Sequence, residues 1–214
     1  ELFCGVLFAH GEHFTSGREH DKWAPVFFGD GFNVPEGAIH PLELDPENMC
    51  KKPVVMAVRG RCYTIGFELL LAQDVRVCAA DARIALLEVK RGIYPVVGGT
   101  VRLFEEIGWG NAMRYLLTGD EVTAEEAYRL GLVQEVVEPG EEVDKAIELA
   151  ETIAKRAPLG VMAALRSARI SRVDGHREAL KRLIPDIIPI LGSEDAKEGI
   201  MSFLERREAV YKGK

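Results

Sequence analysis

The middle of the chain alternates short apolar runs with turn residues. Val54–Val58 is a continuous apolar run that predicts a buried strand, and Arg59–Gly60 ends it. After Gly66, the segment Phe67–Ala72 predicts an apolar helix. Val75–Ala79 predicts a second strand, and a third short run follows at Ile84–Leu87. This alternation of strand-like and helical runs indicates an α/β fold.

Similar patterns continue on both sides of this region. At the start of the chain, Leu2–Phe8 predicts a buried strand, followed by a polar turn. The elements expected after Pro95 are, in order, a helix from Thr100 as N-cap to Ile107, a helix to Leu117 with Gly119 beyond its end, a helix that begins at the capping box Thr123–Glu126 and stops at Gly131, and a strand at Val133–Val137.

The last third of the chain has a helical pattern throughout. One apolar stripe of a first helix consists of Val143, Ala146, Ile147, Ala150, Ile153 and Ala154. Pro158 is expected to begin the next helix, and Ser193 to cap the last one. Between them, Pro185 and Pro189 interrupt an apolar run. Because Ile184–Leu191 is more apolar than a single thin helix needs, we interpret it as a subunit contact.

Composition excludes several classes of protein. With 214 residues, 47% of them hydrophobic, the chain can form one large domain or a domain with a subdomain. The net charge of −7 and the acidic pI argue against nucleic-acid binding. No apolar run approaches the roughly 18 residues of a membrane helix, and the first residues lack the basic region of a signal peptide. Residues 18–48 are rich in Gly and Pro and predict a long functional or partly disordered loop.

The cysteines favour a reducing compartment. Cys4, Cys50, Cys62 and Cys78 show neither CxxC spacing nor close pairing, so we expect free thiols and a cytoplasmic protein.

Two carboxylates stand out because apolar residues surround both. Glu68 lies within IGFELLLA and Glu88 within IALLEVK. Ionising a carboxylate in such surroundings costs free energy unless another group uses it. The structural interpretation is a buried acid paired with an arginine, for which Arg59, Arg76 and Arg83 are candidates. The functional interpretation is a pair of proton-transfer groups.

Two other patterns carry less weight. His10, Glu12, His13 and His20 lie on a predicted turn without a further ligand to complete a metal shell, so we interpret them as surface residues and expect no metal. Gly98–Gly99 before Thr100 lacks the lysine or the spacing of a phosphate-binding loop.

The segments around the two glutamates resemble one known family. KKPVVMAVRG, GFELLLAQDVRV, LLEVKRGIYP and GGT are similar to the enoyl-CoA hydratase/isomerase (crotonase) family. The resemblance implies a crotonase-like spiral of ββα turns over residues 1–157 and a C-terminal helical trimerisation region over 158–214. It also implies a homotrimer or a dimer of trimers, with a further βαβ-type unit of about 40 residues before the strand at Leu2–Phe8.

The resemblance also implies a site for a coenzyme A thioester as substrate, with no further cofactor. Glu68 and Glu88 match the two catalytic glutamates, and the backbone N–H groups of Arg18 and Ile65 match an oxyanion hole. Where the family has a small residue and a glycine run, this chain has Arg18 and Ile65. The remaining positions that match substrate or coenzyme A contacts are Gly17, Gly66, Phe203 and Arg206.

Having both glutamates fits the addition of water across a 2-enoyl thioester, with one carboxylate accepting a proton and the other delivering one. One alternative is an enoyl-CoA isomerase, whose reaction needs only one base, or another crotonase-type reaction. Another alternative is a degenerate family member with a blocked pocket. A related peptidase activity is disfavoured, because this chain has no Ser/His pair at the motif positions. An RNA-binding relative is disfavoured by the acidic charge.

Overall fold

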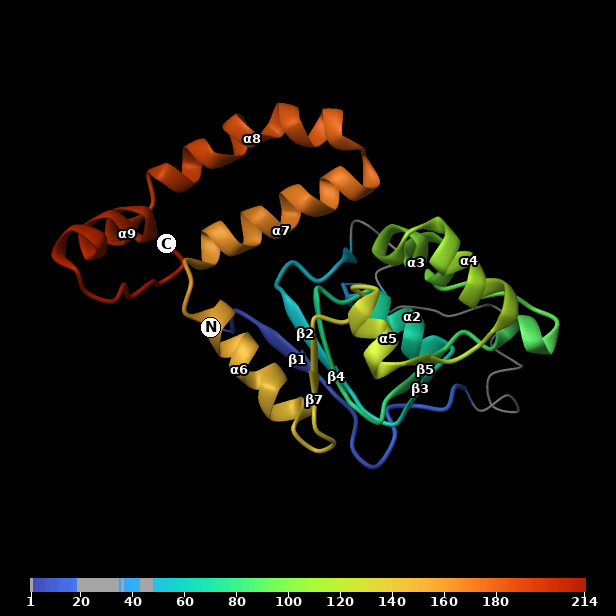
Figure 1. The fold of residues 1–214 in the computed structure, drawn as a ribbon. Coiled ribbons are helices and arrows are strands. Elements are labelled where there is room, and N and C mark those ends of the chain that lie inside the picture. Colours follow the sequence, from blue (N-terminus) through green and yellow to red (C-terminus); the bar gives the residue numbers. More distant parts are fainter. Residues whose placement is uncertain (1, 19–34, 36, 43–47) are drawn as a thin grey trace. The chain divides into compact units, whose positions relative to one another are not determined.

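The computed structural model describes residues 2–18, 35, 37–42 and 48–214 (Figure 1). Most of the predicted loop at 18–48 lies outside these residues. The chain forms two compact units. One comprises Val6–Cys50 and Val54–Ile147, and the other comprises Glu1–Gly5, Lys51–Pro53 and Glu148–Lys214. The boundary expected after residue 157 stays a prediction.

The larger unit is built on two small sheets. The first has the strand order β1-β2-β4-β7, and β4 is parallel to both β2 and β7. The second has the order β3-β5-β6, with β3 and β5 parallel and β6 antiparallel to β5. The strands are β1 (Gly5–Leu7), β2 (Val54–Val58), β3 (Arg61–Tyr63), β4 (Val75–Ala79), β5 (Arg83–Ala85), β6 (Val122–Thr123) and β7 (Glu135–Val137).

The chain visits the two sheets in turn and then forms helix. β2 and β3 precede α2 (Ile65–Leu71), and β4 and β5 precede the 3-10 helix η2 (Glu88–Arg91) and the helices α3 (Gly99–Ile107) and α4 (Trp109–Thr118) (Figure 1). The remaining helices are α5 (Ala124–Arg129), α6 (Glu142–Ala154), α7 (Pro158–Val173), α8 (His176–Leu191) and α9 (Glu194–Glu205). Two strands followed by helix is the repeat expected of a ββα spiral.

The core of this unit lies between the strands and the helices. In β2 every residue after the first is buried, as expected of a strand that lies between two others with both faces covered. Phe67, Leu70 and Leu71 of α2 are almost completely buried. Burial of each such side chain contributes about 1.5–3 kcal/mol. This packing fixes α2, the helix that follows β3 and carries Glu68.

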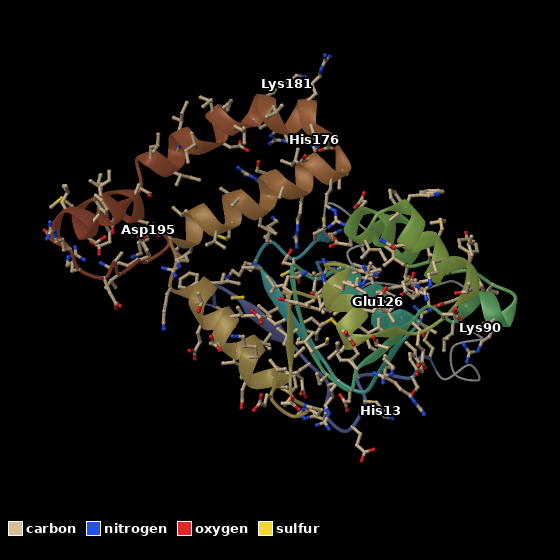
Figure 2. The ribbon with its side chains drawn as sticks, viewed as in Figure 1. His13, Lys90, Glu126, His176, Lys181 and Asp195 are labelled. Carbon is tan, nitrogen blue, oxygen red and sulfur yellow. The ribbon has the colours of Figure 1, made fainter. Side chains whose placement is uncertain are left out.

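Several local predictions are confirmed. β2 and β4 have the predicted bounds, and α7 begins at Pro158. Thr123 caps α5 by accepting a hydrogen bond from the Glu126 N–H at 3.2 Å, and Glu126 lies in the first turn of that helix (Figure 2). Ser193 likewise accepts a hydrogen bond from the Ala196 N–H at 3.0 Å.

Other local features differ from what was expected. α3 begins at Gly99 with Gly98 as its N-cap, not at Thr100. The short strands β3 and β6 were not expected. α8 continues through both Pro185 and Pro189.

The smaller unit is helical from the later part of α6 onward. α7 and α8 form a hairpin joined at Asp174–Gly175, and Ser171 Oγ lies 2.5 Å from His176 Nδ1 at the turn (Figure 2). The buried Asp195 carboxylate, at the start of α9, accepts hydrogen bonds from the N–H groups of Lys212 and Gly213 at 2.7 and 2.8 Å (Figure 2). Within the described ranges, no helix combines the length and apolarity needed to cross a bilayer.

Candidate active site

The site begins where residues 14–17 run beside β3. The Thr15 N–H donates to the Arg61 carbonyl at 2.9 Å, and the Tyr63 N–H donates to the Thr15 carbonyl at 3.0 Å. The Thr15 hydroxyl also accepts a hydrogen bond from the Gly17 N–H at 3.1 Å. These bonds fix the turn that ends at Gly17, so that the segment before Arg18 lies along the strand leading into α2.

Two glycines allow these segments to approach each other closely. A Cβ on Gly17, whose φ is +113°, would lie 2.8 Å from Thr64 Oγ1. A Cβ on Gly66 would lie 2.4 Å from Thr15 Cγ2. A larger residue fits neither place without displacing backbone or side chains. The structure therefore brings Gly17, Arg18, Ile65 and Gly66 into one region, although their sequence positions are far apart.

The start of α2 is strained. Thr64, its N-cap, has φ +53° and ψ −117°, an uncommon conformation for a β-branched residue. Its own N–H donates to the Ala85 carbonyl at 2.8 Å, which ties the start of α2 to β5. Ile65 is the first residue of α2, a position whose backbone N–H has no acceptor within the helix. The strained turn thus presents an N–H donor beside the Gly17 segment.

Glu68 lies one turn into α2 and is 2% exposed. Its Oε1 accepts hydrogen bonds from the N–H groups of Val97 and Gly99, at 2.8 and 2.9 Å. Gly99 is the first residue of α3, so the positive end of that helix dipole also favours the carboxylate. Burial raises the pKa of Glu68, while these N–H groups and the charges of Arg18 and Arg102 oppose the rise.

Glu88 has a different environment. It begins η2 and is 9% exposed, and its Oε2 is buried without a hydrogen-bond partner among the described residues. Burial raises the pKa of Glu88 to about 6. Its own backbone N–H and the charges of Arg91 and Arg18 oppose the rise, and the negative charge of Glu68 adds to it. The negative charge of Glu68 therefore reaches Glu88, whose Oε2, unlike Oε1 of Glu68, accepts no hydrogen bond from the described residues.

The arginines expected to neutralise the glutamates contact other groups. Arg59 Nε lies 4.0 Å from Glu142 Oε1, and Arg76 Nη2 lies 2.7 Å from Glu106 Oε2. Arg83 donates to the Ala82 carbonyl at 2.9 Å. The basic residue whose charge acts on both glutamates is Arg18. Burial lowers the pKa of the Arg18 guanidinium, and the charges of Glu68 and Glu88 raise it.

The other residues singled out in the sequence lie elsewhere. Phe203, 80% exposed, is on α9, and Arg206 caps that helix with φ +55°, both in the smaller unit. Their part in coenzyme A binding stays a prediction. His20 lies outside the described residues, and within the described part of the chain no group of His, Cys, Asp and Glu could hold a metal ion.

Sequence reasoning missed three parts of the site. The donors of Val97 and Gly99 are backbone groups, which every residue but proline carries, so their side chains give no signal. The strain at Thr64 is also invisible in the sequence. The sequence signal available for these donors was the Gly98–Gly99 pair, which was considered above as a phosphate-binding loop. Its glycines are needed because a Cβ on Gly99 would lie 3.0–3.2 Å from Pro95, Leu86 and Glu68 Oε1.

Comparison with known proteins gives one consistent result. A model of the family "Enoyl-CoA hydratase/isomerase" matches residues 44–214. The chain is 35% identical over 210 residues to enoyl-CoA hydratase EchA19 of Mycobacterium tuberculosis, covering 97% of this chain and 78% of that protein. It is 36% identical over 229 residues to a carnitinyl-CoA dehydratase of Salmonella arizonae, covering 96% and 88% respectively.

Solved structures agree with these relatives. A probable enoyl-CoA hydratase/isomerase from Mycobacterium abscessus superposes with a TM-score of 0.95 at 44% identity, covering 99% of this chain and 81% of that one. An enoyl-CoA hydratase from Mycobacterium tuberculosis superposes with a TM-score of 0.87 at 36% identity, with the same coverage. These likenesses confirm the predicted crotonase-like fold with its C-terminal helices. The chain belongs to the enoyl-CoA hydratase/isomerase family.

Proposed function

We propose that the protein is an enoyl-CoA hydratase, a lyase that adds water across the double bond of a 2-enoyl-CoA thioester. The observation that carries the proposal is a pair of buried carboxyls, Glu68 and Glu88, which differ in their hydrogen bonds and of which the negative charge of Glu68 raises the pKa of Glu88. Its relatives named enoyl-CoA hydratase and carnitinyl-CoA dehydratase support the reaction class.

The environments of the two carboxyls support separate roles. Glu68 accepts two backbone N–H bonds, which favour its ionised form and suit a general base. Glu88 has a raised pKa of about 6 and a buried oxygen without a donor, which suit a general acid near neutral pH. Water attacks the β carbon as Glu68 takes its proton. Electrons move onto the thioester oxygen, and Glu88 delivers a proton to the α carbon, giving a 3-hydroxyacyl-CoA.

The developing charge on the thioester oxygen needs hydrogen-bond donors. We assign this part to the backbone N–H groups of Arg18 and Ile65, with Gly17 and Gly66 allowing the approach. The close contact between Gly17 and Thr64, and the place of Ile65 at the first position of α2, support this assignment. Removing a single donor from such a hole costs about 10²–10³-fold in rate in other enzymes.

A panel of enoyl-CoA thioesters of increasing chain length tests the reaction, with hydration followed as the loss of the conjugated enoyl absorbance. Glu68→Gln and Glu88→Gln keep side-chain size and remove the titrating oxygen. Each should lower kcat by about 10²–10⁴-fold, with coenzyme A binding little changed. An isomerase would instead depend chiefly on Glu88 and would convert 3-enoyl to 2-enoyl thioesters. Unchanged turnover in both variants would refute the assignment.

We further propose a homotrimer or a dimer of trimers. The supporting observation is the apolar surface of α8, where Ile184 is 69% and Leu191 65% exposed in the single chain. Such surface on a helix is typical of a protein contact. Light scattering at micromolar concentration should give the mass of three or six chains, and a monomer would contradict this proposal.

A reducing, cytoplasmic location is also proposed. It is supported by Cys62 and Cys78, which are buried thiols in adjoining parts of the core cluster and form no disulfide. Cell fractionation tests this location.

A further inference from the structure

Arg18 introduces a basic side chain at the two-glutamate site. It follows Gly17, the residue whose Cα approaches Thr64 so closely that a Cβ would lie 2.8 Å from Thr64 Oγ1. The Thr64 carbonyl in turn accepts a hydrogen bond from the Glu68 N–H at 3.1 Å. The Arg18 side chain therefore starts beside the first turn of α2, the turn that carries Glu68. Its Nε is buried beneath the surface.

Charged groups reach the carboxyl pair from four segments of the larger unit. They are Glu68 on α2, Glu88 and Arg91 on η2, Arg102 on α3, and Arg18 on the segment beside β3. Arg102 acts on Glu68, and Arg91 on Glu88. Arg18 acts on both carboxyls. On Glu88 the charge of exposed Arg91 acts more strongly than that of Arg18, but Arg91 does not act on Glu68, where Arg18 does.

Two carboxyls in one dry site resist ionising together, and they titrate as a coupled pair. The proposed reaction needs the pair to hold one proton, with one carboxylate ionised as the base and one carboxyl protonated as the acid. That state carries a single negative charge, which the guanidinium of Arg18 balances. A pair without this cation would take up a second proton at higher pH, and the doubly protonated form contains no base.

We propose that Arg18 is a positioning residue that sets the proton count of the Glu68–Glu88 pair, through the charge of its side chain rather than through its backbone. This role rests on the proposed hydratase function. It is separate from the oxyanion donor at the same residue, because the N–H is retained in any side-chain substitution other than proline.

The first test compares pH profiles of kcat/KM for wild type and Arg18→Met, which keeps an unbranched side chain and removes the charge. The acidic limb, where the base becomes protonated, should move to higher pH by about one unit in Arg18→Met. Arg18→Lys keeps a cation and should retain most of the wild-type position. Arg91→Met is the matched control, because it removes a cation that acts on Glu88 but not on the base Glu68. It should therefore move the acidic limb less than Arg18→Met does.

The second test needs no turnover. In protein labelled with ¹³C at the glutamate carboxyl carbon, Glu68→Gln and Glu88→Gln assign the two signals. Both carboxyls should then titrate at higher pH in Arg18→Met than in wild type. If Arg18→Met does not fold, Arg18→Gln removes the same charge with a polar side chain.

These measurements separate the two proposals. Carboxyl titrations that are the same in wild type and in the neutral Arg18 variants overturn the role of Arg18, even if wild type hydrates enoyl-CoA. A wild type that turns over no enoyl-CoA refutes the hydratase function, and the role of Arg18 in catalysis falls with it. A shifted titration together with a shifted pH limb is the expected result.

Discussion

Glu88→Gln should remove a specific pH dependence from the stability of the larger unit. The folded protein raises the pKa of Glu88 from 4.5 to about 6, so the folded state binds this proton more tightly than the unfolded state. Each unit of difference corresponds to 1.36 kcal/mol, which gives at most about 2 kcal/mol. Because the folded pKa is raised, this contribution is fully present below about pH 4.5 and is lost as the pH rises through about 6.

The glutamine variant cannot titrate, so it lacks this decline. The difference in free energy of unfolding between Glu88→Gln and wild type should therefore change by up to about 2 kcal/mol between pH 4 and pH 8, in favour of the variant at pH 8. Comparing the two pH values removes any constant difference between an amide and a carboxyl in the folded site. Between pH 4 and pH 8, the Glu88→Gln variant should therefore gain stability relative to wild type, although it has lost activity.

Urea unfolding at a series of pH values measures this difference. Both tryptophans of the chain fall within residues 6–147, and Trp109 lies on α4, so tryptophan fluorescence follows the larger unit. Glu138→Gln, at an exposed position just after β7 in the larger unit, controls for the loss of one negative charge from a chain of net charge −7. A Glu88→Gln difference that stays constant from pH 4 to pH 8 would refute the argument that burial holds the proton on Glu88.

Three further outcomes are expected. Gly99→Ala should displace the Glu68 carboxylate, because the new Cβ would lie 3.2 Å from Glu68 Oε1. It should therefore lower kcat by about 10²-fold. The control Gly110→Ala on α4, where a Cβ meets nothing within 4 Å, should leave kcat unchanged. Ile65→Gly should widen or shift the range of acyl chains hydrated by the panel assay while circular dichroism shows the same fold, and an identical range would contradict a role for the Ile65 side chain in the pocket. Arg206→Ala should weaken coenzyme A binding about tenfold or more in calorimetry, since a guanidinium bonded to phosphate contributes about 1.5–3 kcal/mol; unchanged affinity would place the nucleotide elsewhere.

Two central strands and the two glutamates were accessible from the sequence because they leave strong local signals. Val54–Val58 is a continuous apolar run, and Val75–Ala79 is apolar except for Arg76; they form β2 and β4 with the predicted bounds. Glu68 and Glu88 were conspicuous because their sequence neighbours are apolar, and both are in fact buried. In each case, the residues that determine the outcome are close together in the sequence.

The start of α3 was mispredicted for a physical reason. Thr100 is a favourable capping residue, and the local rule places the helix start there. In the structure the Glu68 carboxylate, from a different helix, accepts the Gly99 N–H and so satisfies the first turn of α3. A side chain distant in sequence has replaced the local cap. The same long-range contact explains why the two backbone donors to Glu68 could not be predicted.

The hydrogen bonds of the two glutamates also argue that the pair is kept for its chemistry. A buried polar atom without a partner costs about 1–3 kcal/mol, and more when it is charged. Glu68 avoids most of this cost through Val97 and Gly99, while Glu88 Oε2 has no donor in the described part of the chain. A purely structural acid at Glu88 would be more stable as an amide or an apolar residue. An acid that must release its proton to a substrate carbon needs an oxygen that nothing else holds.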